Sequence, residues 1–106
     1  MIEADRPVVD ADGYLVDPED WTEAFALETA ARLGIEMTEE HWDVVRFMRE
    51  ERDKHGVSPD ARHVMRHLTQ TRGAHRNRLF ELFPYGYPGQ ACRIAGMKRP
   101  RVWSTG

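Results

Sequence analysis

The fold of this chain is constrained most by four segments in which apolar residues recur at helical spacing, each bounded by a capping residue or a glycine. Asp17 followed by Pro18 predicts the start of a first helix, which Gly34 ends. Thr38 caps a second, longer helix that runs to about His55. A chain of 106 residues with this pattern is expected to form one domain built mainly of helices.

The second half of the chain predicts two further helices and a short one. Ser58 and Pro59 mark the start of the third helix, which a polar turn at residues 70–73 follows. Residues 75–83 are expected to form a fourth helix, and residues 90–95 one or two helical turns. The apolar residues expected on the inward faces are Trp21, Ala24, Phe25, Leu27, Ala30, Ala31, Trp42, Val44, Val45, Met48, Ala61, Val64, Met65, Leu68, Leu79, Leu82 and Phe83.

The N-terminal residues 6–16 are predicted to form a β-hairpin. Valines and a tyrosine flank an Asp-Ala-Asp-Gly sequence, and Asp12-Gly13 supplies the residue types that a tight turn needs. Because a lone hairpin is only marginally stable in water, we expect it to pack on the helices. The expected fold class is therefore α+β and mostly α, with a small N-terminal β-meander or hairpin packed on a bundle of about five helices.

The last ten residues differ in character from the rest of the chain. No periodicity is present from Met97 onward, and this segment is predicted to be an extended arm. We therefore expect a single domain over residues 1–96 and a C-terminal arm over residues 97–106.

Composition limits the class of protein. No apolar run approaches the roughly 18 residues of a membrane-spanning helix, and residues 1–5 lack the basic region and apolar core of a signal peptide. Cys92 is the only cysteine in the sequence, which excludes two-thiol redox chemistry within one chain. These features favour a protein of the reducing cytoplasm.

Charge is divided unevenly along the chain. Residues 1–57 contain 6 Lys or Arg and 16 Asp or Glu, for a net charge of −10, whereas residues 58–106 contain 9 and 2, for a net charge of +7. This division could hold the two halves together, or could attract an acidic partner or a phosphate backbone. Two helices between residues 58 and 83 also resemble a helix-turn-helix in outline. The candidate DNA-contacting residues are Arg62, Arg66, Arg72, Arg76 and Arg78.

Cys92 and a pair of histidines are the candidate reactive side chains. Beside Arg93, the Cys92 thiol could have a lowered pKa and carry sulfur, or link two chains on oxidation. On residue type, a small buried side chain in a monomeric protein is the favoured interpretation. His63 and His67 stand at the i, i+4 spacing at which two imidazoles can share a metal ion, but no cysteine or HExxH sequence accompanies them. A solvated pair is the favoured interpretation, and we expect neither a metal nor a cofactor.

Several stretches in a fixed order resemble the DsrC/TusE family of sulfur-relay proteins, which includes the gamma subunit of dissimilatory sulfite reductase. The resemblance covers about residues 8–100. The stretches that carry it are Asp12-Gly13-Tyr14-Leu15 with Asp20-Trp21, residues 38–49, Ser58-Pro59-x-x-Arg62, Leu82-Phe83-Pro84-x-Gly86 and Gln90-Ala91-Cys92-Arg93-Ile94-Ala95-Gly96.

This resemblance implies a small cytosolic sulfur carrier whose C-terminal arm reaches into a partner, such as a sulfite reductase or a tRNA-thiolation enzyme. It implies a working thiol at the second-to-last residue of the arm. In the sulfite-reductase branch a second cysteine lies eleven positions upstream of that thiol. Cys92 matches this upstream cysteine, but the position eleven residues after it holds Trp103.

The substitution at position 103 changes the function that the resemblance implies. Tryptophan cannot carry a persulfide, but it offers a large rigid apolar surface with one N–H donor. We therefore expect a regulatory or accessory module of sulfur metabolism that binds a protein partner through its arm. A sulfur carrier that uses Cys92 alone and a DNA-binding regulator are the alternatives. The candidate partner-binding residues are Lys98, Arg99, Pro100, Arg101 and Trp103.

Overall fold

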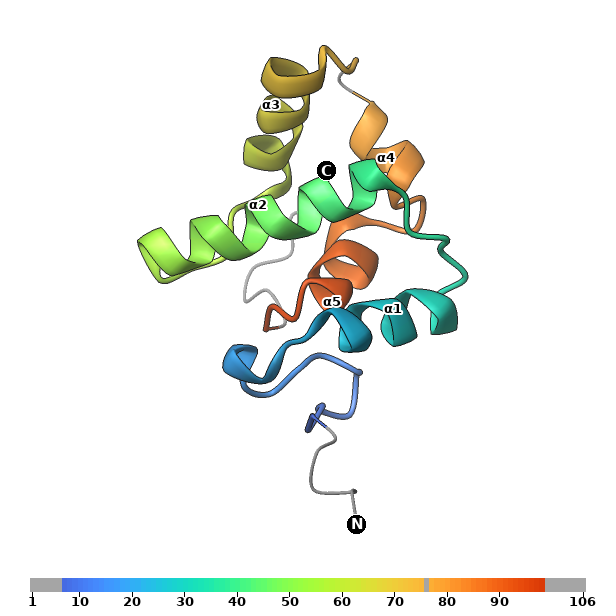
Figure 1. The fold of residues 1–106 in the computed structure, drawn as a ribbon, viewed down its shortest axis with the longest axis vertical. Coiled ribbons are helices and arrows are strands. Elements are labelled where there is room, and N and C mark those ends of the chain that lie inside the picture. Colours follow the sequence, from blue (N-terminus) through green and yellow to red (C-terminus); the bar gives the residue numbers. More distant parts are fainter. Residues whose placement is uncertain (1–6, 76, 99–106) are drawn as a thin grey trace.

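The long helix α2 lies across the middle of the molecule, with α3 and α4 on one side of it and α1 and α5 on the other (Figure 1). The computed structural model describes residues 7–75 and 77–98. No helix within these ranges is long and apolar enough to cross a lipid bilayer. The helices in chain order are η2 (Pro18–Asp20), α1 (Glu23–Arg32), α2 (Glu39–His55), α3 (Ala61–Arg72), α4 (Arg78–Leu82), the π-helical turn η3 (Tyr87–Ala91) and α5 (Cys92–Ile94).

The helix α2 has the bounds that the sequence predicts. The Thr38 hydroxyl accepts a hydrogen bond from the backbone N–H of His41, and His41 Nδ1 accepts one from the backbone N–H of Thr38. His41 Nε2 then donates to the carbonyl of Leu82, 2.9 Å away, which fixes the start of α2 to the end of α4. Gly56 ends the helix in the left-handed conformation, at φ +77°.

The prediction that the N-terminal residues form two paired strands is wrong. The described residues hold one isolated antiparallel bridge, between Val9 and Leu15, and no strand. The Asp10 carboxylate accepts from two backbone N–H groups, including that of Tyr14, and closes a tight turn whose backbone pairing does not extend beyond this bridge. Pro7 has no N–H to extend the pairing. The fold of the described residues is therefore helical rather than α+β.

The predicted first helix is divided in two. Asp17 caps only the short turn η2, and Thr22 caps α1 by accepting from the N–H of Phe25. The break lies at Trp21, whose extended backbone (φ −67°, ψ 139°) turns its indole away from the α1 axis. The inward face consequently differs from the prediction. Phe25, Ala26, Thr29 and Ala30 are buried, whereas Ala24, Leu27 and Ala31 are exposed.

The third and fourth helices differ from the prediction at their ends. Asp60, not Ser58, caps α3, and the helix continues through the expected polar turn to Arg72 before Gly73 ends it. α4 is shorter than residues 75–83, but its predicted inward residues are all buried. These residues are Leu79, Leu82 and Phe83.

The last described residues pack into the core. Cys92, Ile94 and Ala95 belong to one buried cluster with Val44, Val45 and Met48 of α2. Met97 joins the same cluster, although the sequence assigns it to the arm. Lys98 is exposed, and the rest of the predicted arm lies outside the described residues.

We predict that Gly96→Ala destabilises the fold more than Gly56→Ala. Both glycines have positive φ, +73° and +77°, which costs a residue with a side chain about 1–2 kcal/mol. A Cβ on Gly96 would lie 2.5 Å from Cδ1 of Trp21, whereas a Cβ on Gly56 would meet nothing within 4 Å. Overpacking of this kind adds about 1–3 kcal/mol. Urea unfolding of both variants measures the difference, and equal losses of stability would contradict the packing described at Gly96.

Candidate functional site

The candidate site is the base of the arm, where α5 ends and the chain leaves the core. The N–H of Gly96 donates to the carbonyl of Arg93 and the N–H of Met97 donates to the carbonyl of Cys92, so both peptide groups continue the turn of α5. Met97 is fully buried and the next residue, Lys98, is exposed. The point at which the chain emerges is therefore fixed by the fold.

Two side chains from other segments hold this base, and we call them the Arg49–Trp21 clamp. Trp21 Nε1 donates to the carbonyl of Ile94 at 2.9 Å. Arg49 donates to the carbonyl of Ala95 at 2.7 Å and to that of Pro18 at 2.8 Å. The guanidinium also lies 4.5 Å from the centre of the Trp21 ring, within the range of a cation–π contact. The clamp thus joins η2, α2 and the end of α5.

Arg49 is a partly buried cation whose hydrogen bonds within the described residues go to carbonyls rather than to a carboxylate. Burial lowers its pKa, and the charge of Asp53 acts in the opposite direction. A guanidinium stays charged in proteins, so the two carbonyl dipoles and the Trp21 ring must offset the loss of hydration. The two hydrogen bonds of the Arg49 guanidinium can form together only when the carbonyls of Pro18 and Ala95 are correctly placed, so they fix these two segments relative to each other.

Cys92 lies inside the core, with 1% of its surface exposed. Burial raises the pKa of its thiol to about 12, and the Tyr87 hydroxyl beside it offsets this only in part. That hydroxyl donates to the carbonyl of Pro59. Arg93 does not approach the thiol as a counterion, because its guanidinium lies 4.9 Å from the centre of the Tyr14 ring. The suggestion that Arg93 lowers the pKa of the Cys92 thiol is therefore wrong. Cys92 is instead a small buried residue, as the favoured interpretation of the sequence has it.

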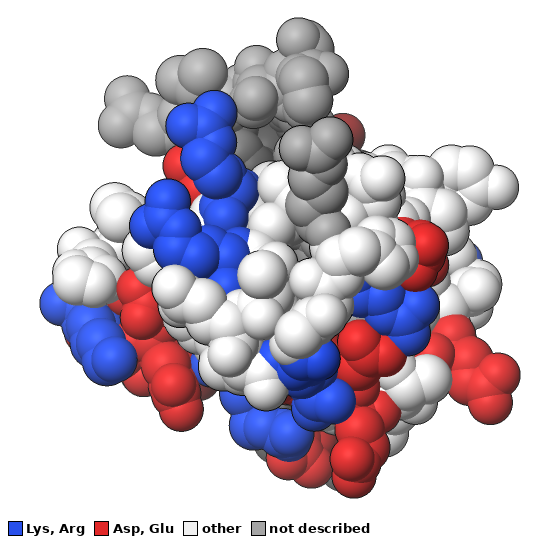
Figure 2. Space-filling view, turned by 90° about the horizontal axis from the view of Figure 1, so that it is seen from above, with Lys and Arg blue, Asp and Glu red and all other residues white. Residues whose placement is uncertain are grey.

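The five arginines proposed to contact DNA do not form one free surface. Arg72 bonds to Asp43 at 2.7 Å, and Arg78 bonds to both Glu40 and Glu81. Figure 2 shows basic and acidic side chains adjoining over much of one face. α4 has five residues, which is short for a helix that reads a DNA groove. Arg62 and Arg66 are exposed on α3, and Arg76 lies outside the described residues.

The predicted histidine pair lies beside α2 rather than in free solvent. His63 contacts Glu51 at 3.2 Å and His67 contacts Asp43 at 3.0 Å. Both imidazole rings stack with the ring of Phe47. Within residues 7–75 and 77–98 no group of three or more His, Cys, Asp or Glu side chains is arranged to hold a metal ion.

Sequence reasoning missed the roles of Trp21 and Arg49. Trp21 was assigned to the face of a helix, and Arg49 lies at the edge of the buried face of α2, where an arginine usually extends into solvent. Their partners lie 31 to 73 residues away, so no local spacing indicates them. Of the candidate partner-binding residues, only Lys98 is described, and Arg99, Pro100, Arg101 and Trp103 lie outside the described residues.

Comparison with known proteins gives a consistent result. Residues 1–102 match the model of the DsrC family, described as DsrC like protein. The chain is 40% identical over 94 residues to the sulfurtransferase TusE of Sodalis glossinidius, which covers 86% of this chain and 87% of that protein. It is 38% identical over 105 residues to the sulfurtransferase TusE of Yersinia pestis, covering 94% and 96%.

A solved structure agrees with the sequence comparisons. The oxidized gamma subunit of dissimilatory sulfite reductase (DsrC) from Archaeoglobus fulgidus superposes with a TM-score of 0.83 at 33% identity. The superposition covers 98% of this chain and 97% of that one. The helical arrangement that positions the base of the arm is therefore shared with that protein.

We predict that the folded protein resists thiol alkylation. At pH 8 a thiol with a pKa of about 12 has on the order of a thousandfold less thiolate than one with an ordinary pKa near 9, and burial also excludes the reagent. Intact mass after treatment with iodoacetamide should show no adduct in buffer and one adduct in guanidinium chloride. Alkylation at equal rates in both conditions would show that Cys92 is accessible in the folded protein.

Proposed function

The chain belongs to the DsrC/TusE family of sulfur-relay proteins, and from that membership we propose that it is a regulatory or accessory module of sulfur metabolism. It binds a protein partner through its arm and does not itself carry sulfur. Its setting is the reducing cytoplasm, where a lone thiol stays reduced. Trp103 is the main anchor of the arm, and the neighbouring cations Lys98, Arg99 and Arg101 contribute charge.

The proposal is supported by one combination of features. The fold at the base of the arm is shared with a DsrC structure, whereas the arm has a tryptophan where the resemblance implies a cysteine. The Arg49–Trp21 clamp fixes the residues from which the arm leaves the core. An arm that only binds still needs this fixed origin, since a defined exit point lowers the entropy lost on docking. The resemblance to the family implies a working thiol at the position of Trp103, whose indole suits insertion into an apolar pocket.

The alternatives find less support. A carrier that uses Cys92 alone requires a thiolate that a sulfur donor can reach, whereas this thiol is buried with a raised pKa. A dimer linked through Cys92 has the same requirement. A DNA-binding regulator would have to act with Arg72 and Arg78 already bound to carboxylates.

Affinity capture with three variants tests the proposal. The full chain, tagged at its N-terminus, is immobilised and exposed to a lysate of the source organism, and retained proteins are quantified by mass spectrometry. We expect one protein to be retained by both the wild type and Trp103→Phe. Once that partner is purified, its affinity for Trp103→Ala should be roughly 30-fold weaker than for the wild type, as for an interface hot spot.

The matched control is Arg46→Ala, an exposed arginine on α2, distant in sequence from the arm. It should retain the same protein as wild type. Equal binding of that partner by wild type and Trp103→Ala would contradict a role for the arm tryptophan.

A further inference from the structure

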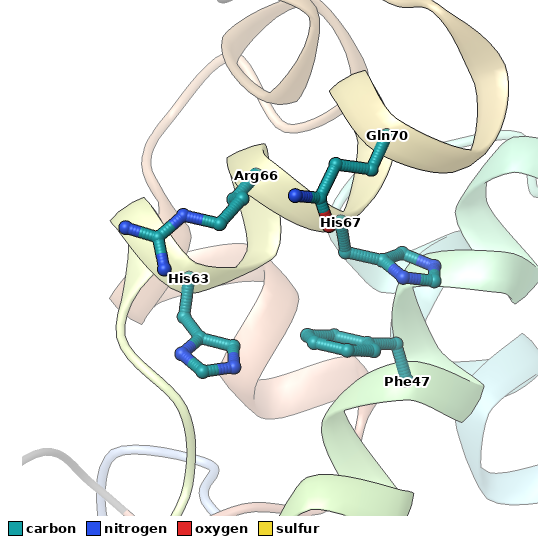
Figure 3. A pocket seen from close by; sticks show the side chains of 5 residues that line it. All are labelled: Phe47, His63, Arg66, His67 and Gln70. Carbon is teal, nitrogen blue, oxygen red and sulfur yellow. The ribbon is translucent and has the colours of Figure 1, made fainter.

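A shallow hollow lies between α2 and α3, apart from the base of the arm. It has a volume of about 100 Å³, enough for the end of one side chain. Figure 3 shows the Phe47 ring of α2 with the His67 imidazole above it and the His63 imidazole beside it, both from α3. The residues that line it are Phe47, His63, Arg66, His67 and Gln70.

The floor of the hollow is a preformed aromatic surface. The rings of Phe47 and His67 are stacked, with centroids 4.1 Å apart and an interplanar angle of 16°. The His63 ring also lies near the Phe47 ring, with centroids 5.6 Å apart and an interplanar angle of 26°. Because each imidazole also contacts a carboxylate at about 3 Å, the three rings are held in place before any ligand arrives.

The acids next to the hollow are already paired. Asp43 accepts hydrogen bonds from Arg72 and His67, which lower the pKa of its carboxyl group although burial acts in the opposite direction. Asp43 is therefore already paired with these two side chains. Glu51 likewise lies within 4 Å of three cations or imidazoles. These groups are Lys54, His55 and His63.

The rim, in contrast, carries positive charge without a counterion. Arg66 lines the hollow, and Arg62 lies one turn earlier on the same helix. Both are exposed, and neither forms an ion pair or hydrogen bond with another described residue. Four residues of α-helix separate their positions by about 6 Å along the axis. A guanidinium beside an aromatic floor suits a carboxylate at the end of a short aliphatic stem.

We propose that this hollow is a second docking point, which receives an acidic side chain from a helix of a protein partner. Arg66 pairs with the carboxylate, the Phe47 and histidine rings contact the methylene groups, and Arg62 meets a second acid one turn along the partner helix. The inference goes beyond binding by the arm, because none of these residues belongs to the arm.

A protein carboxylate fits better than a nucleic acid backbone. The hollow accommodates one side chain, whereas a phosphate backbone requires a row of free cations. The other described arginines of the α3–α4 region, Arg72 and Arg78, are held by Asp43, Glu40 and Glu81. Those carboxylates would repel neighbouring phosphates.

An NMR titration of the full-length, ¹⁵N-labelled chain tests this docking point. The probe is an acetylated and amidated alanine-based helical peptide with two glutamates four residues apart. We expect it to shift the amide signals of residues 62–70. Arg66→Gln should weaken binding at least about fivefold, as the loss of a charge-assisted contact. The control variant Arg46→Gln should bind the peptide as wild type does.

Two further probes and one further variant separate the alternatives. The matched peptide with glutamine in place of glutamate should bind poorly, and Trp103→Ala should bind the acidic peptide normally, which keeps this test independent of the arm. Equal binding of both peptides, or no shifts in α3, would overturn the proposal. Tighter binding of a twelve-nucleotide oligo-dT than of the acidic peptide would overturn it in favour of a nucleic acid site.

Discussion

The fold at the base of the arm depends on one partly buried cation that donates its hydrogen bonds to backbone carbonyls. Arg49 donates to Ala95 and Pro18 while its guanidinium covers Trp21, which itself donates to Ile94. Each carbonyl left without a donor in this environment would cost about 1–3 kcal/mol. The clamp thus fixes the positions of η2, the central helix α2 and the end of α5 relative to one another.

This arrangement is compatible with the function that we propose, in which the sulfur-relay scaffold binds a partner and does not carry sulfur. The clamp holds α5 against the core, which seals Cys92 and fixes where the chain emerges at Lys98. Burial and the raised pKa of the Cys92 thiol disfavour its reaction with a sulfur donor, while a fixed exit point holds the base of the arm whatever residue the arm presents. The docking point that we propose on α3 would give a partner another contact away from the arm, and the two contacts together would raise the affinity.

Features set by local chemistry were predictable from the sequence. The Thr38 cap and the terminating glycine Gly56 define α2 because capping depends on neighbouring residues. The break at Trp21 was not predictable, since the indole is turned by a carbonyl 73 residues away. The N-terminal turn lacks strands because its backbone pairing is limited to the single bridge between Val9 and Leu15. The family could be predicted from short stretches of sequence in a fixed order. The hollow at Phe47 could not, because it forms only where α2 packs on α3.

The most direct test of the clamp is amide hydrogen exchange at the base of the arm. The N–H groups of Ala95 and Met97 donate to carbonyls in the same turn, and the account predicts that they exchange as slowly as the core amides of α2. Arg49→Gln should accelerate exchange at these two amides, whereas Arg46→Gln should not. Rapid exchange of both amides in the wild type, with α2 still protected, would contradict the claim that the clamp fixes the arm base.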